Sequence, residues 1–268
     1  MSELEMVDKR SSQDAVVARI ADGDSLLIGG WGDIRKPMSL VKAIARAGLK
    51  NLTVYSYAAM DLDLLVGTDS VKQALFGFVA CDGGAPIRAG NVNRARCDAS
   101  VDIREMDEYM FACQFKAAAE RIPFYPVRGG IGSDVLTVNP QIKTIVDPYG
   151  DETLVAVPAC SPDHVLIHVN EADQLGNAKI AGDPFFDRVF AKAGKHVVVS
   201  CERVVPVGEI RDADILGIYV DQVVESKNAA RPGSCYPDYD FDAEACLAYS
   251  RATQDPAEFA NYFAREMV

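Results

Sequence analysis

The chain has 268 residues, of which 49% are hydrophobic, and a formal net charge of −12 at pH 7. This apolar content is enough for a large buried core and excludes a disordered chain. The acidic balance, with a pI near 4.7, argues against a nucleic-acid surface, so an anionic ligand has to be held by local basic side chains or backbone N–H groups.

The sequence favours a protein of a reducing compartment. The first ten residues are charged and lack an apolar stretch, which argues against a signal peptide, and no run approaches the roughly 18 apolar residues of a membrane span. The seven cysteines never form C-x-x-C, which favours reduced thiols over a zinc ribbon. We expect a cytoplasmic protein that does not contact membranes.

The N-terminal part of the chain predicts a strand, a glycine loop and a helix in succession. A first helix through Val16–Ile20 precedes the apolar strand Leu26–Ile28. The loop Gly29–Pro37 follows and leads into a helix with the apolar face Leu40–Ala45. This order builds an anion or oxyanion site from backbone N–H groups.

The same loop does not match a dinucleotide fingerprint. A G-x-G-x-x-G frame that starts at Gly30 and Gly32 has Arg35 where the third glycine belongs. The following strand, Leu52–Tyr57, does not end in a ribose-binding acid. We therefore expect no nicotinamide cofactor.

Two groups of basic residues are candidates for holding an anion. Arg35 and Lys36 lie in the first glycine loop, and Arg88, Arg94 and Arg96 lie in a stretch that is predicted to be a Gly/Asn-rich loop. Solvated surface charge is the alternative interpretation for both groups.

The stretch Val101–Asp134 combines acids with a second glycine loop. Arg104–Glu108 opens a predicted helix over Tyr109–Arg121, and the strand Phe124–Val127 then leads into Arg128–Asp134 with its three glycines. If both ends of this unit face one cleft, a carboxylate and exposed N–H groups meet there, which is the pairing that acyl chemistry needs.

The acids of this stretch have two interpretations. Asp107 and Glu108 fit the first turn of a helix, where carboxylates complement unpaired N–H groups and the helix dipole. Glu105 lies earlier, at a strand-to-helix corner, where open α/β folds place residues that contact ligands.

The rest of the chain continues the alternation of strands and helices. Further strands are predicted at Gln73–Ala80, Leu154–Val157, Val165–Val169, His196–Ser200 and Ile215–Val224, with a helix near Phe185–Ala193. We expect one α/β domain over residues 1–268, with an open mixed or mostly parallel sheet flanked by helices and a tail that is irregular from about 229 and then helical. His164 and His168 do not predict a zinc site, because four residues of strand separate them by about 13 Å.

The motifs together resemble those of the α subunit of family I CoA-transferases, in the glutaconate CoA-transferase-like branch. The resemblance is carried by Ile28–Pro37, Phe115–Phe124, Arg128–Asp134 and Ile167–Asn177, and it covers nearly the whole chain. It implies the NagB/RpiA-like fold of these enzymes, a β-subunit partner and an active site between the two subunits.

One difference between this sequence and the transferase pattern resembles a particular branch of the family. True transferases use a glutamate of the β subunit, and no residue of this chain matches it. The acidic turn Arg104–Glu108, with Gly30–Gly32 and Arg35–Met38, looks like the α subunit of steroid ring-cleaving hydrolases, which act on a cyclic CoA thioester. A transferase α subunit is the alternative, and a non-catalytic scaffold subunit is the third possibility.

The resemblance implies a role for each candidate residue, with CoA as part of the substrate and no further cofactor or metal. Glu105 is the expected base that activates water. The expected supporting residues are Gly30, Gly32, Gly130 and Gly132 as oxyanion donors, Arg104, Arg128 and Ser133 as orienting groups, Trp31 and Asp134 in the pocket, and Arg35, Lys36, Arg88, Arg94 and Arg96 at the CoA phosphates.

Overall fold

The structure, a computed structural model, describes residues 7–80 and 89–266. The helices are α1 (Gln13–Val17), α2 (Met38–Ala47), α3 (Met60–Gly67), α4 (Gly90–Asp98), α5 (Glu108–Ala119), α6 (Val135–Val138), α7 (Asp187–Ala193), the 3-10 turn η1 (Gly217–Tyr219), α8 (Ala243–Ala252) and α9 (Pro256–Glu266). The strands are β1 (Ser25–Ile28), β2 (Leu52–Ala58), β3 (Val71–Val79), β4 (Asp102–Glu105), β5 (Phe124–Val127), β6 (Lys143–Val146), β7 (Thr153–Pro158), β8 (His164–Asp173), β9 (Ala178–Lys179), β10 (His196–Val205) and β11 (Gln222–Glu225).

A twisted parallel sheet forms the body of the described chain. Its strand order is β11-β10-β8-β1-β2-β3-β4, all parallel, with the short β9 antiparallel to β8. Helices cover both faces, so the central strands are buried on both sides and consist of continuous apolar runs. This arrangement confirms the expected α/β class with a mostly parallel sheet.

Each face of the sheet has its own hydrophobic core. Side chains of a strand alternate between faces, so Leu26 and Ile28 pack in the core under α2 and α3, while Leu27 packs in the other. Phe111 of α5 and Phe190 of α7 fill that second core. The two cores fix how α5 and the loop after β1 meet at the sheet edge.

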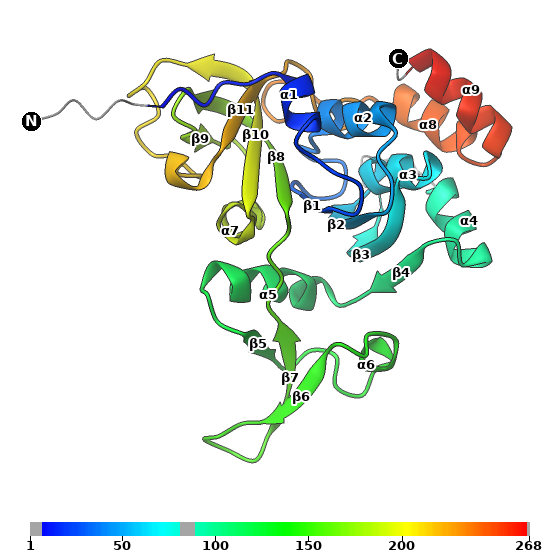
Figure 1. Cartoon of the computed structure of the whole chain (residues 1–268), viewed down its shortest axis with the longest axis vertical. Coiled ribbons are helices and arrows are strands. Elements are labelled where there is room, and N and C mark those ends of the chain that lie inside the picture. The colour runs from blue at the N-terminus through cyan, green and yellow to red at the C-terminus, as the bar shows by residue number, and fades with distance from the viewer. Residues whose placement is uncertain (1–6, 81–88, 267–268) are drawn as a thin grey trace, which may run out of the picture.

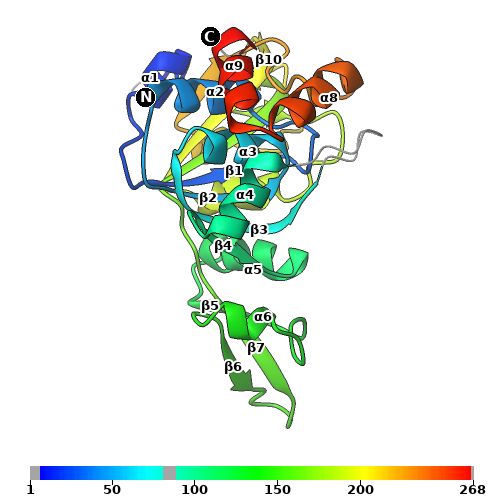
Figure 2. The same cartoon turned by 90° about the vertical axis from the view of Figure 1, so that its right-hand side faces the viewer.

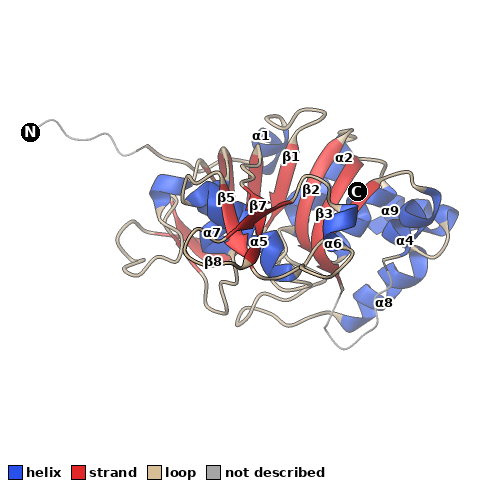
Figure 3. Cartoon of the chain, turned by 90° about the horizontal axis from the view of Figure 1, so that it is seen from below, coloured by secondary structure: helices blue, strands red, loops and turns tan. Residues whose placement is uncertain are grey.

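A small antiparallel sheet projects from the body. Its order is β5-β7-β6, and it extends away from the main sheet below α5 (Figures 1 and 2). Seen from that end, α5, β5 and β7 lie in front of the parallel strands (Figure 3). The predicted strands at Phe124–Val127 and Leu154–Val157 are confirmed as β5 and β7, whereas β6 and the separate sheet were not predicted.

The predicted strand at Ile215–Val224 is wrong over most of its length. The structure has η1 followed by the short β11 in this region. Gly217 lies so close to the turn between β8 and β9 that a Cβ there would be 2.4 Å from the Leu175 carbonyl oxygen. This close approach turns the chain, so only its last residues join the sheet.

The C-terminal residues form a helical pair, as expected. α8 and α9 lie beside α3 and α4 (Figure 1). Phe259 of α9 packs against Gly67 at the end of α3. None of the helices in residues 7–80 and 89–266 has the length and apolar composition needed to cross a bilayer.

The strand order places the glycine loop at a topological switch point. From β1 the chain builds the sheet in one direction through β2, β3 and β4, and later adds β8, β10 and β11 on the other side of β1. Open α/β sheets bind ligands at the carboxyl ends of strands near such a point. The loop after β1 and the end of β4 lie at this edge.

Candidate active site

The loop after β1 requires glycine at two positions. Gly30 and Gly32 have φ angles of 75° and 56°, in the left-handed region. A Cβ on Gly30 would lie 2.4 Å from the carbonyl oxygen of Ile34, which is closer than real contacts allow. The tight turn therefore depends on glycine, as the sequence predicts.

The backbone N–H groups of this turn are engaged within the chain. Gly30 donates to Oδ1 of Asp187 at 2.9 Å, and Gly32 donates to the carbonyl oxygen of Tyr57 at 3.1 Å. A single N–H bonded in this way is not free for a ligand. The prediction that Gly30 and Gly32 supply N–H donors for an oxyanion is therefore wrong.

Arg35 and Lys36 point into the protein. Arg35 is 1% exposed, and its Nη1 lies 2.6 Å from Oδ2 of Asp187. Lys36 is also 1% exposed and contacts Ser56 Oγ at 2.8 Å and Asp61 Oδ2 at 3.3 Å, while burial lowers the pKa of Lys36. Because buried charges need partners, both residues hold the loop to the core. This corrects the expected phosphate-binding role.

Trp31 forms an aromatic wall beside the acidic turn. Its ring meets Phe78 edge-to-face at 4.8 Å and stacks on Phe185 at 5.7 Å. Its indole Nε1 donates a hydrogen bond of 2.8 Å to Oε1 of Glu108. The two residues are 77 positions apart, and no local pattern in the sequence joins them.

The acids of the turn separate into different roles. Asp107 caps α5 by accepting hydrogen bonds from the backbone N–H groups of Tyr109 and Met110 at 3.0 and 3.1 Å. Glu105 ends β4, and its carboxylate has no hydrogen-bond or ion-pair partner within residues 7–80 and 89–266. Glu108 is oriented by Trp31. The cap interpretation therefore holds for Asp107, whereas Glu108 has a tertiary partner.

A groove joins the acidic turn to the second glycine loop. It has a volume of about 700 Å³ and is open to solvent. The lining residues are Gly77, Phe78, Glu105, Met106, Asp107, Glu108, Gly130, Ser133, Asp134, Val135 and Val138. The structure thus brings together four of the predicted site residues, Glu105, Gly130, Ser133 and Asp134.

The second glycine loop presents free N–H groups. Gly130 and Gly132 have φ angles of 90° and 79°, and in the described part of the chain neither N–H makes a hydrogen bond. Ser133 Oγ donates to the Gly130 carbonyl oxygen at 2.8 Å and so stiffens the turn. A Cβ on Gly130 would lie 3.0 Å from Met110 Sδ, which shows how closely the loop approaches α5.

Two predicted arginines lie outside the groove. Arg104 precedes Glu105 on β4, so its side chain points to the opposite face, where it pairs with Asp102 at 2.8 Å. Arg128 is exposed and pairs with Glu152 of the projecting sheet at 2.9 Å. Neither side chain is directed at a substrate held beside Glu105.

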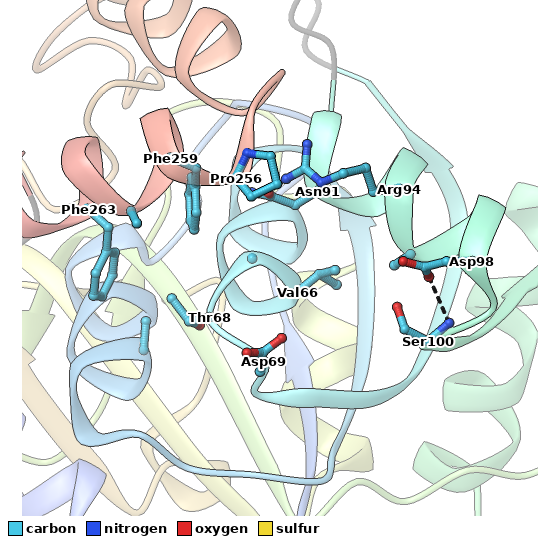
Figure 4. Close-up of a pocket in the computed structure, with 14 residues that line it drawn as sticks. Val66, Thr68, Asp69, Asn91, Arg94, Asp98, Ser100, Pro256, Phe259 and Phe263 are labelled. Carbon is cyan, nitrogen blue, oxygen red and sulfur yellow. Dashed lines mark hydrogen bonds between the residues drawn. The ribbon is translucent and has the colours of Figure 1, made fainter.

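The predicted Gly/Asn-rich loop is wrong over Gly90–Asp98, which form helix α4, and its arginines belong to another region of the fold. Arg88 lies outside the described residues. Arg94 lines a separate pocket of about 530 Å³ between α3, α4 and α9 (Figure 4), where its guanidinium donates to the Thr253 carbonyl oxygen at 2.5 Å. Arg96 is exposed on α4. Arg94 therefore ties α4 to the C-terminal helices.

A buried polar network surrounds His168. Its Nε2 lies 2.9 Å from Glu202 Oε1 and its Nδ1 2.9 Å from Ser200 Oγ, while Tyr239 donates to Glu202 at 2.8 Å. Burial acts to raise the pKa of Glu202, but these hydrogen bonds outweigh it and hold the pKa at about 2.

His168, Glu202 and Cys235 are close enough together to consider a metal ion. Burial raises the pKa of the Cys235 thiol to about 12, which disfavours the thiolate that metals bind. Hydrogen bonds within the protein already account for the His168 and Glu202 side chains, so this cluster is a structural network.

Comparison with known proteins identifies the family of the chain. Residues 9–226 match the family described as Coenzyme A transferase. The cholesterol ring-cleaving hydrolase IpdA subunit of Rhodococcus jostii is 37% identical over 270 residues, which cover 96% of this chain and 91% of that protein.

Solved structures show the same fold. Glutaconate coenzyme A-transferase from Acidaminococcus fermentans matches with a TM-score of 0.89 and 27% identity over 96% of this chain and 87% of that chain. The decarboxylase AibA/AibB, as its C56S variant, matches with a TM-score of 0.87 and 26% identity over 97% of this chain and 100% of that chain. The chain belongs to the Coenzyme A transferase family and has its α/β fold.

Proposed function

We propose that this chain is the α subunit of a heteromeric enzyme that opens the ring of a cyclic β-keto acyl-CoA by hydrolysis. The observation that carries the proposal is the groove that is lined both by Glu105, whose carboxylate has no partner in the described chain, and by Gly130, whose N–H group makes no hydrogen bond there. The 37% identity to a ring-cleaving hydrolase subunit supports this chemistry over others in the family.

The reaction needs a base, donors for an oxyanion and an electron acceptor. Water gives a proton to the base, and its oxygen adds to the ring ketone to form a tetrahedral oxyanion. The bond between the ketone carbon and the α-carbon of the thioester then breaks, the electron pair is delocalised into the thioester, and the α-carbon takes the proton that the base had accepted. The new carboxylic acid loses its proton to solvent. The product is a ring-opened carboxylate that keeps its CoA.

The described residues supply these roles as follows. Glu105 is the base, because its carboxylate is open to the groove and bound to no other group in the described chain. The N–H group of Gly130, which lines the groove, is the oxyanion donor, and Ser133 and Asp134 line the groove from the same loop. Phe78, packed on Trp31, provides an apolar surface for the ring.

The partner subunit closes this site in our proposal. Glu105 and Glu108 are exposed in the single chain, and catalysis by a carboxylate is favoured when water is excluded around it. Val138 lines the groove and is 57% exposed, and Tyr109 and Ile131, each next in the sequence to a lining residue, are 46% and 48% exposed. Apolar surface of this kind is characteristic of a subunit interface. From the cysteine spacing we propose a cytoplasmic location.

A CoA-transferase α subunit is the second candidate. It is favoured by the TM-score of 0.89 to glutaconate coenzyme A-transferase. A transferase moves CoA only when a free carboxylic acid is present as acceptor, whereas the hydrolase needs only water. Turnover without an acceptor therefore separates the two functions.

The proposal is tested by replacing Glu105 in the co-purified complex. Glu105→Gln keeps the shape but removes the base, so kcat for ring opening should fall by about 10²- to 10⁴-fold. Glu120→Gln, at the exposed end of α5, is the matched control and should leave kcat unchanged. Wild-type turnover by a folded, paired Glu105→Gln complex would exclude Glu105 as the base.

A further inference from the structure

Lys116 of α5 stands apart from the other cations around the site. Arg35, Lys36, Arg104 and Arg128 each have an acidic partner. For Lys116, no carboxylate within residues 7–80 and 89–266 forms an ion pair with its ammonium group. Its positive charge is therefore available to an anion from outside the described chain.

Aromatic rings hold this ammonium group in place. Lys116 Nζ lies 4.6 Å from the ring centroid of Tyr109, 5.5 Å from that of Tyr125 and 5.9 Å from that of Phe186, and it donates a 3.1 Å hydrogen bond to the Tyr109 hydroxyl. Burial acts to lower the pKa of Lys116, but the Tyr109 hydrogen bond and nearby groups raise it overall. The group is thus a fixed cation at neutral pH.

Lys116 does not itself line the groove, but its aromatic contacts connect it to the acidic turn that does. Tyr109 directly follows Glu108, and the lysine side chain reaches back along α5 toward the start of the helix, as helical side chains do. Phe186 stacks on Tyr57 at 5.8 Å, and the Tyr57 hydroxyl donates to the Glu108 carbonyl oxygen at 2.6 Å. Two aromatic rings, those of Phe186 and Tyr57, therefore connect the ammonium group to the backbone of Glu108.

We propose that Lys116, with the Tyr109 hydroxyl, binds a carboxylate on the acyl part of the substrate, at a distance from the thioester. This inference rests on the proposed function, since it assigns a substrate feature to the same site. A single ammonium group between rings matches one carboxylate attached to an apolar body. The phosphates of CoA carry several charges and are matched by several cations with few apolar neighbours.

Equilibrium binding to the co-purified complex tests this assignment without any turnover. The probes are adipoyl-CoA and hexanoyl-CoA, which differ in a terminal carboxylate or methyl group, together with CoA alone. A second pair, suberoyl-CoA and octanoyl-CoA, has a longer acyl chain and so tests a greater distance between the thioester and the terminal carboxylate. Titration calorimetry should show tighter binding of the carboxylated member of at least one pair, by about tenfold, as for one charge-assisted hydrogen-bonded contact.

Variants assign the preference to the cation. Lys116→Met should abolish the difference in affinity between the paired probes and leave the affinity for CoA unchanged. Lys116→Arg keeps the positive charge and should keep most of the difference in affinity between the paired probes. Lys192→Met is the matched control, because Lys192 also lies over a tyrosine ring, that of Tyr219 at 5.6 Å, on another helix; it should keep the full preference.

Two results would overturn the inference. One is equal binding of the paired probes by the wild-type complex. The other is a loss of affinity for CoA itself in Lys116→Met, which would assign the cation to a phosphate. Because these titrations do not depend on ring opening, their failure is distinct from a failure of the proposed hydrolysis.

Discussion

Glu105 and Glu108 are three residues apart, yet the structure gives them different surroundings. Glu105 ends a strand and its carboxylate is open to the groove, whereas the Glu108 carboxylate is held by the Trp31 indole. A base must be free to accept a proton from water, while a neighbouring fixed carboxylate sets the charge and shape of the site. The difference makes Trp31 a positioning residue.

Replacing Trp31 tests this coupling. Trp31→Phe keeps aromatic packing against Phe78 and Phe185 but removes the hydrogen bond to Glu108. We expect kcat to fall about tenfold, which corresponds to about 1.4 kcal/mol, with little change in thermal stability. Tyr149→Phe, at a 99% exposed ring on the projecting sheet, is the control. Unchanged kcat in Trp31→Phe would remove Trp31 from the site.

A stability prediction concerns the buried pair beneath the glycine loop. Asp187 accepts hydrogen bonds from the Gly30 N–H and from Arg35. Asp187→Ala leaves the Arg35 charge buried without its partner and should lower the free energy of unfolding by about 3 to 5 kcal/mol. Asp212→Ala, whose side chain is 99% exposed, should change it by less than about 1 kcal/mol. Similar denaturation midpoints for both variants would contradict this account.

These residues show why part of the site could not be predicted from the sequence. The glycines and Glu105 could be predicted because each follows or ends a predicted strand in the sequence, and in the structure they lie at the ends of strands. Arg35, by contrast, is buried by a partner 152 positions away, and a basic residue in a glycine loop looks the same whether it faces solvent or the core. A prediction from the local sequence therefore assigns a phosphate-binding role to basic residues that are in fact buried.

At the scale of elements, α5 connects stability to activity. Asp107 caps its first turn, and the next residue is Glu108. Asp107→Ala should lower the free energy of unfolding by about 1 kcal/mol and also reduce kcat, because the first turn positions Glu108.

A second helix cap provides the matched comparison. Asp255 accepts hydrogen bonds from the Ala257 and Glu258 N–H groups at the start of α9, on the far side of the molecule from the groove. Asp255→Ala should cost similar stability and leave kcat unchanged. If the two variants lose activity equally, global stability rather than the start of α5 controls turnover.

The elements differ in how well they could be predicted. β1, β2, β3, β8 and β10 are apolar runs because both faces of a parallel sheet are buried, and that signal is strong. α3 was not predicted, because it is buried almost all round and lacks the polar face that marks an amphipathic helix. β6 has little apolar pattern, because most of its residues are exposed on the projecting sheet.

At the scale of the whole molecule, stability should depend on acid pH through the network around Glu202. The folded-state pKa of Glu202 is about 2, below its ordinary value of 4.5. Its stabilising contribution is therefore present above pH 4.5 and is lost as the pH falls from 4.5 toward 2. Chemical denaturation of Glu202→Gln should show a lower free energy of unfolding at pH 7 and a flatter decline in this window. Parallel curves for the two proteins would exclude this contribution.

The mostly parallel sheet and the ligand-binding edge follow from the order of apolar strands and glycine loops. The shape of the site does not, since the groove depends on how β4, α5 and the loop after β5 approach one another in space. Because we propose that a partner subunit closes the open groove, ring opening has to be measured on the complex.

The most direct test is mass spectrometry of the co-purified complex with a cyclic β-keto acyl-CoA in ¹⁸O-labelled water, without a carboxylic acid acceptor. Our account predicts a ring-opened product that retains CoA and carries one ¹⁸O atom in its new carboxylate. An unchanged ring, with CoA transferred only after a free carboxylic acid is added, would contradict hydrolysis and identify the chain as a transferase subunit.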